Sequence, residues 1–269
     1  MKILINYADE NYKNEQKRNS YTGIKNGGFD KVIEFSPEKL DQDFLEQHSS
    51  FISNNKRGGG YWIWKPFIIL KTLKEVADFG DFIFYCDSGS MFINTIDYLI
   101  VELEKSHQDI FLTEIPLIEY QWTKYECFKK LNCLDNKYLY SNQVQSGFIL
   151  IKKTKSSIEF FEKYISVCVD YSNINDDWNK DINRDLIDHR HDQSILSLLA
   201  KKASLELFRD ISQYGTRPWQ YINPNLDFNI KKYRNSNYPQ IVNLYRKDNW
   251  YKVLIKERIK DLIGVKLRQ

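Results

Sequence analysis

The 269-residue sequence is poor in cysteine, and none of its four cysteines forms a CxxC pair. Their scattered spacing argues against a zinc site and against a disulfide framework, so we expect a cytoplasmic protein. No apolar run approaches the roughly 18 residues that a membrane-spanning helix needs. The apolar part of the N-terminus is also too short for a signal peptide.

The chain has little net charge, because 39 Lys and Arg residues nearly balance 36 Asp and Glu residues. The resulting charge of +3 is too small to predict nucleic-acid binding. The motifs of a P-loop, of a GxSxG hydrolase and of an HExxH metalloprotease are absent as well. The composition, 42% hydrophobic and 28% charged, is that of an ordinary globular protein.

Short apolar runs alternate with amphipathic segments along most of the chain. This alternation predicts one α/β domain with a central, mostly parallel sheet flanked by helices. Strands are expected at residues 2–7, 31–35, 81–87, 109–113, 148–151 and 205–208. Helices are expected at residues 37 to about 48, 67–77, 93–105, 119–131, 156–171 and 195–202. Residues 10–30 are polar and carry no predicted element.

The C-terminal segment differs from the rest of the chain. We divide the sequence into a domain of residues 1–245 and a basic amphipathic helix of residues 246–269. The apolar residues of this segment follow helical spacing, and lysines and arginines lie between them. Such a helix either rests on an anionic membrane surface or packs on the domain, and both alternatives stay open.

Polar groups cluster where the predicted strands end or begin. Asp87 follows the apolar run 82–86, and residues 145–147 lead into the run 148–151. Three further patches are the glycine-tryptophan segment of residues 56–66, residues 191–193 and residues 215–219. The carboxyl ends of parallel strands meet at one edge of a sheet, so we expect these groups to converge. They offer a carboxylate for a metal, cations for phosphate and aromatic rings for a base or sugar. This inventory suits group transfer from a metal-bound nucleoside diphosphate.

Three motifs resemble those of a known enzyme class. The segment Tyr85–Ser90 resembles the DxD region of nucleotide-sugar glycosyltransferases with the GT-A (Rossmann-like) fold, and His191–Ser194 resembles their late Asp-Gln segment. Residues Gly215–Trp219 are similar to the Gly-x-x-Lys-Pro-Trp ending of the glycogenin and lipooligosaccharide galactosyltransferase family, with Arg217 in place of lysine. The segment Gly60–Pro66, together with His189–Ser194, looks most like small bacterial glycosyltransferases of capsule and lipopolysaccharide loci, and the resemblance as a whole spans residues 1 to about 220.

The resemblance implies transfer of a sugar, with a UDP-sugar as the expected donor, to a cell-surface glycan or lipid-linked glycan. The protein would then work in the cytoplasm or on the inner face of the plasma membrane. It implies that Asp87 binds Mn²⁺ or Mg²⁺, or the donor ribose. The other expected donor-site residues are Asn6, Tyr7, Trp62, Trp64, Lys65, Ser88 and Arg217, in which Lys65 and Arg217 neutralise the diphosphate. The expected catalytic residues are His191, Asp192 and Gln193.

Two departures from the family pattern concern the metal. Gly89 stands where the second carboxylate of DxD is expected, and Ile211 stands where a histidine is expected. A metal on Asp87 would then need another ligand, for which His191 and Asp210 are the candidates.

The mechanism and the class of protein also stay open. An inverting mechanism would take its general base from Asp192, Glu114 or Glu119, whereas a retaining one requires no strong nucleophile. A non-catalytic nucleotide- or carbohydrate-binding module and a nucleotidyltransferase remain the alternatives.

Overall fold

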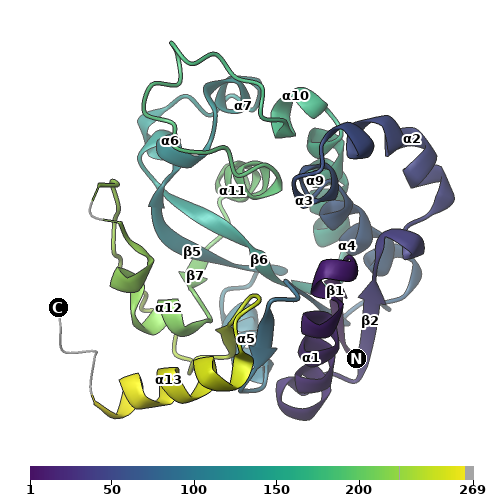
Figure 1. Cartoon of the computed structure of the whole chain (residues 1–269), viewed down its shortest axis with the longest axis vertical. Coiled ribbons are helices and arrows are strands. Elements are labelled where there is room, and N and C mark those ends of the chain that lie inside the picture. Colours follow the sequence, from purple (N-terminus) through teal and green to yellow (C-terminus); the bar gives the residue numbers. More distant parts are fainter. Residues whose placement is uncertain (224, 264–269) are drawn as a thin grey trace.

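The computed structural model describes residues 1–223 and 225–263, and it confirms the predicted α/β class. Six strands form one sheet in the order β2-β1-β3-β6-β5-β7, with helices on both of its faces (Figure 1). The strands of this sheet are β1 (Lys2–Tyr7), β2 (Lys31–Phe35), β3 (Phe82–Cys86), β5 (Ile110–Ile118), β6 (Asn142–Lys152) and β7 (Leu207–Arg209). All six lie at predicted positions, although β5 and β6 extend well beyond the predicted runs.

The direction of β6 decides how the site is assembled. Strand β1 pairs in parallel with β2 and β3, and β5 pairs in parallel with β7, whereas β6 is antiparallel to both β3 and β5. The amino end of β6 therefore lies at the edge where the other strands have their carboxyl ends. Residues 145–147 belong to β6 itself and reach Asp87 from that side. Because these residues are not apolar, a search of the sequence for apolar runs does not detect this part of the strand.

Both faces of the sheet are buried. Ile83 and Tyr85 of β3 belong to a core shared with the helices α4 (Trp64–Glu75), α9 (Lys155–Cys168) and α11 (Asp192–Lys202). Phe84 and Cys86 belong to a second core on the opposite face. Successive strand residues point to opposite faces, so a strand covered on both sides must be apolar throughout. Each fully buried side chain of this size contributes about 1.5–3 kcal/mol.

Most predicted helices are present with shifted ends. They are α2 (Gln42–Asn54), α4 (Trp64–Glu75), α5 (Asp97–Lys105), α6 (Glu119–Trp122), α7 (Tyr125–Lys130), α9 (Lys155–Cys168) and α11 (Asp192–Lys202). Further short helices are α3 (Gly58–Tyr61), α8 (Asn136–Leu139), α10 (Tyr171–Ile174) and α12 (Gln213–Thr216). Short 3-10 turns cover Glu10–Tyr12, Pro37–Lys39 and Pro218–Tyr221. The predicted helix at Pro37 is therefore a 3-10 turn followed by α2.

Helix α1 (Lys13–Thr22) was not predicted, and it continues into a π-helical turn at Gly23–Gly27. Its buried residues are the polar Gln16, Asn19 and Thr22, so the apolar period that marks a packed helix is missing. Asn19 instead donates a hydrogen bond from Nδ2 to the carbonyl oxygen of Ser90, 3.0 Å away. Hydrogen bonds therefore hold this helix where a hydrophobic stripe would normally do so.

The C-terminal segment packs on the domain. Strand β8 (Val242–Leu244) pairs antiparallel with β4 (Ser90–Phe92), and α13 (Trp250–Leu262) lies along the edge of the molecule beside α12 (Figure 1). Neither β4 nor β8 was predicted, and the last predicted residues, 264–269, lie outside the described part. Within that part, no helix has the length and apolar character needed to cross a membrane.

Candidate functional site

Asp87 lies directly beyond the carboxyl end of β3, as the apolar run before it predicts. Its backbone N–H donates to the carbonyl oxygen of Gly147 at 2.9 Å, which ties it to β6. The hydroxyl of Tyr85 donates to Asp87 Oδ1 at 2.6 Å. The Asp87 side chain is 49% exposed. The site therefore exposes to solvent a carboxylate whose position is fixed by these two hydrogen bonds.

Lys65 lies behind this carboxylate in the first turn of α4. Its Nζ is 2.9 Å from Asp192 Oδ2, 3.0 Å from Ser146 Oγ and 3.7 Å from Asp87 Oδ1. Burial alone would lower the pKa of Lys65, but the charges of Asp192 and Asp87 outweigh burial and raise it. The amine is therefore a permanent cation between two carboxylates. The three side chains together carry a net charge of one negative.

The start of α11 supplies the other side of the site. Tyr164 of α9 donates from its hydroxyl to Asp192 Oδ2 at 3.2 Å, and the Asp192 side chain is only 4% exposed. Gln193 accepts the backbone N–H of Ser146 at 3.2 Å through Oε1. Of the five polar patches expected to converge, four meet here through Lys65, Asp87, Ser146 and the Asp-Gln segment. The fifth does not join them, because Gly215, Thr216, Pro218 and Trp219 line a cavity whose lining includes none of these residues.

The exit of β1 borders the site through buried side chains. Asn6 is fully buried and donates from Nδ2 to Asn19 and Ser20 of α1. Ser88 donates from its hydroxyl to the carbonyl oxygen of Tyr7 at 2.6 Å. Asn6 therefore ties β1 to α1, and Ser88 ties the turn after β3 to the end of β1. Neither is exposed for the direct donor contact that was expected of it.

The glycine-tryptophan segment folds on itself. The φ angles of residues 58–62 are all positive, a conformation that three successive glycines make accessible. This turn lets Trp64 donate from Nε1 to the carbonyl oxygen of Gly58 and stack on Tyr7, with 3.7 Å between ring centroids. Trp64 is buried and Trp62 half-buried. Trp62 is the more accessible of the two candidate platforms.

His191 is placed differently from the catalytic role expected of it. The ring is 1% exposed, stacks on Tyr61 at 4.4 Å, and points Nδ1 at the carbonyl oxygen of Ile174 at 2.7 Å. Burial lowers the pKa of His191, which keeps the ring neutral. It also provides no side-chain cap for α11. His191 therefore supports the start of α11 from its buried side.

Arg217 does not present a cation to a ligand in this structure. Its side chain is fully buried, with Nη1 2.6 Å from Asp261 Oδ1 and Nη2 hydrogen-bonded to Glu257. Both acids lie on α13. Because the guanidinium is already neutralised, the expected contact with the donor diphosphate has no support, and Arg217 anchors the C-terminal helix instead.

The residues around Asp87 do not make up a metal site. In residues 1–223 and 225–263, no group of three or more His, Cys, Asp or Glu side chains is placed to hold a metal ion. His191 faces Ile174, and Asp210 accepts the backbone N–H of Ser212 at 2.6 Å. The two candidate second ligands therefore do not join Asp87.

The three candidate general bases are all paired. Glu119 is fully buried and lies 2.7 Å from Lys201, so it belongs to the core. Glu114 accepts from Lys231 and from the Tyr233 hydroxyl at 2.9 Å. Asp192 is paired with Lys65. Glu114 also lines a cavity.

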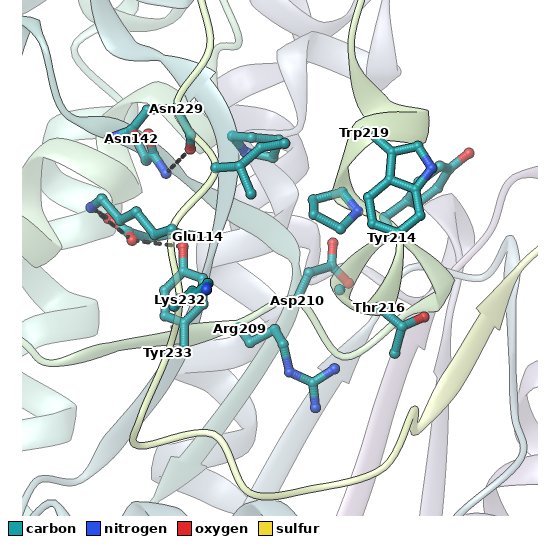
Figure 2. Close-up of a pocket in the computed structure, with 15 residues that line it drawn as sticks. Glu114, Asn142, Arg209, Asp210, Tyr214, Thr216, Trp219, Asn229, Lys232 and Tyr233 are labelled. Carbon is teal, nitrogen blue, oxygen red and sulfur yellow. Dashed lines mark hydrogen bonds and ion pairs between the residues drawn. The ribbon is translucent and has the colours of Figure 1, made fainter. Parts of the chain in front are cut away.

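That cavity has a volume of about 550 Å³ and lies beyond β5 and β7. Figure 2 shows Asp210 between Glu114 and Tyr233 on one side and Tyr214 and Trp219 on the other. Acidic, basic, amide and aromatic side chains line it together. This combination can bind a molecule that has both hydroxyl groups and an apolar ring face.

Sequence reasoning missed the side chains that orient the charged groups. Tyr85 and Tyr164 each donate to one carboxylate, yet both read as apolar core residues because their rings are buried. A buried tyrosine hydroxyl normally finds a partner, so a tyrosine two residues before Asp87 was a usable signal. Tyr164 carried no such local signal.

No protein-family model matches the sequence, and no curated protein matches it. Mouse xyloside xylosyltransferase 1 (apo form) is a similar solved structure, with a TM-score of 0.51 and 8% identity over 91% of this chain and 97% of that one. The bifunctional glycosyltransferase WbbM (apo) gives 0.50 and 9% over 94% of this chain and 49% of that one. The galactosyltransferase LgtC, in complex with donor and acceptor sugar analogues, gives 0.47 and 16% over 98% and 96%.

At such identities the likeness shows the fold alone. The chain has the GT-A fold that it shares with nucleotide-sugar glycosyltransferases, so the predicted fold is confirmed. The comparisons leave the donor and the acceptor open.

Proposed function

We propose that this protein is a glycosyltransferase that transfers a sugar from a nucleoside diphosphate, with UDP-sugar as the first candidate, to a glycan acceptor. One observation carries the proposal. Asp87, Lys65 and Asp192 come from three separate elements and meet at the carboxyl edge of the sheet of a GT-A fold. Ligands of open α/β sheets bind at that edge.

Each member of the site takes a separate role in the proposal. Asp87 is the exposed carboxylate that contacts the donor, through the ribose or sugar hydroxyls. Lys65 is a positioning residue, because it is buried and holds both carboxylates. Gln193, which is half-buried, faces the transferred sugar, and Trp62 packs on the base or the sugar.

The acceptor side of the proposal rests on the cavity beside Glu114. Its carboxylate and amide groups suit sugar hydroxyls, and the ring of Trp219 suits the apolar face of a pyranose. Glu114 would be the general base if the reaction inverts the anomeric centre. Its pairing with Lys231 then has to loosen when the acceptor binds.

The same proposal includes a peripheral membrane contact through α13, because the acceptor is a cell-surface glycan that is still being assembled. The acids Glu257 and Asp261 face Arg217, so the outward face carries the exposed apolar residues Tyr251, Ile255, Ile259 and Leu262. Lys252, Lys256 and Arg258 are exposed on the same helix. An apolar face with flanking cations is typical of helices that lie on anionic membranes.

The test is a donor screen. The purified protein is incubated with a panel of nucleotide sugars, and mass spectrometry shows which donor loses its sugar, with and without candidate glycans. We expect one donor to be hydrolysed or transferred by the wild type. Asp87→Asn should reduce that rate about 10- to 100-fold, the cost of one hydrogen bond to a charged group. Its circular dichroism spectrum should stay unchanged.

Tight binding of a nucleoside diphosphate without turnover of any donor would favour the non-catalytic module instead. An Asp87→Asn variant with full activity would remove Asp87 from the donor site.

A further inference from the structure

Gly89 stands at the position of the second metal-binding carboxylate of the DxD pattern. In the structure, another part of the chain packs against this position. A Cβ atom on Gly89 would lie 3.0 Å from the Cα and 3.5 Å from the backbone nitrogen of Arg246. The 3.0 Å contact is tighter than most Cβ contacts, and because it involves a backbone atom it cannot be relieved by turning a side chain. A side chain at this position, two residues after Asp87, therefore requires the backbone of the C-terminal segment to shift by a few tenths of an ångström.

The contact with Gly89 is specific and holds Arg246 in an unusual conformation. The backbone N–H groups of Tyr245 and Arg246 both donate to the carbonyl oxygen of Gly89, at 3.0 and 2.7 Å. The φ of Arg246 is +51°, which is uncommon for a residue other than glycine. Strain of this kind persists where surrounding contacts impose it. The segment thus fixes the base of the Arg246 side chain beside the Asp87 turn.

A diphosphate bound at this edge of the sheet would need a cation to neutralise it. Lys65, Asp87 and Asp192 sum to one negative charge, which would repel a diphosphate. Lys65 is enclosed, and Arg217 is neutralised by Glu257 and Asp261. Arg246 is exposed and forms no ion pair within the described part of the chain. Its guanidinium is planar, always charged and suited to paired hydrogen bonds with phosphate oxygens.

We propose that Arg246 binds the diphosphate of the donor in place of a divalent metal, so that donor binding by this protein is independent of metal ions. The inference rests on the proposed function, because it assumes a nucleoside diphosphate at Asp87. Asp87 then acts as a lone carboxylate that accepts hydrogen bonds from hydroxyl groups. The donor set agrees, since one carboxylate with a cation 3.7 Å away is a poor metal site.

The experiment is calorimetric titration of the full chain with UDP and with UMP, in EDTA and again in MnCl₂ or MgCl₂. ADP, CDP, GDP and dTDP are tested in the same way. For the nucleoside diphosphate that binds, we expect the same Kd within about twofold in EDTA and in metal. Arg246→Gln should weaken its binding about 10- to 100-fold and weaken the matching monophosphate less. Arg246→Lys should retain part of the affinity.

Arg234→Gln is the matched control, because Arg234 is likewise an exposed arginine, and it should bind as the wild type does. Gly89→Asp restores the missing carboxylate; it should lower the melting temperature by about 2 °C or more and create no metal-dependent binding.

The outcomes separate the two proposals. Nucleoside diphosphate binding that requires metal, or that Arg246→Gln leaves unchanged, overturns the inference and leaves the proposed function standing. Binding of no nucleoside diphosphate under any condition overturns both.

Discussion

The buried ion pair between Lys65 and Asp192 should contribute strongly to the stability of the fold. Replacing Lys65 should lower the free energy of unfolding more than replacing Asp192. At 2.9 Å and an effective dielectric constant of about 20, the attraction is about 6 kcal/mol before desolvation is subtracted. Lys65→Met leaves two carboxylates without their shared cation, and Asp192 is buried. Breaking a buried pair in this way costs about 3–5 kcal/mol.

Asp192→Asn should cost less, about 1–3 kcal/mol. In this variant Lys65 keeps Asp87 at 3.7 Å and the Ser146 hydroxyl at 3.0 Å, so no buried charge is left alone. The double variant should be more stable than the sum of the single losses predicts, by about 0.5–3 kcal/mol. Native stabilities of about 5–15 kcal/mol leave all three variants folded enough to measure.

The assay is urea unfolding at pH 7.5, followed by tryptophan fluorescence and circular dichroism. Lys71→Met is the control, because Lys71 lies on the same helix but forms its ion pairs with Asp41 and Glu75 near the surface. It should change the free energy of unfolding by less than about 1 kcal/mol. Equal losses for Lys65→Met and Asp192→Asn, or additive losses, would refute the shared-cation arrangement.

Two further predictions concern pH and membranes. Burial lowers the pKa of His48, His189 and His191, so the unfolded chain takes up protons near pH 6.5 that the folded chain does not. Their contribution is complete above that pH and is lost as the pH falls, so the urea midpoint should drop between pH 7 and 5; a constant or rising midpoint would contradict this. Ile255→Glu with Ile259→Glu should abolish sedimentation with phosphatidylserine vesicles while the melting temperature is kept, since both side chains point outward. Equal sedimentation of this variant and the wild type would remove the membrane role of α13.

Local sequence was sufficient for the elements whose burial produces a simple pattern. The run Phe82–Cys86 had to be a strand covered on both faces, and that alone placed Asp87 at a strand end. The late Asp-Gln pair was likewise found at the start of a helix. Helix α1 was not predicted because its buried face is polar. The length of β6 was underestimated because its first residues are polar.

The sequence by itself determined the α/β class, the places of the six strands of the central sheet and the place of Asp87 at a strand end, because these depend on residues close together in the chain. The tertiary structure decided which charges meet. Lys65 and Ser146 are 81 residues apart, and they touch because β6 runs against its neighbours. Folding of the C-terminal segment likewise placed Arg217 under α13 and Arg246 against Gly89. A cation's role depends on whether it is enclosed with acids or open to solvent, and local sequence does not encode that.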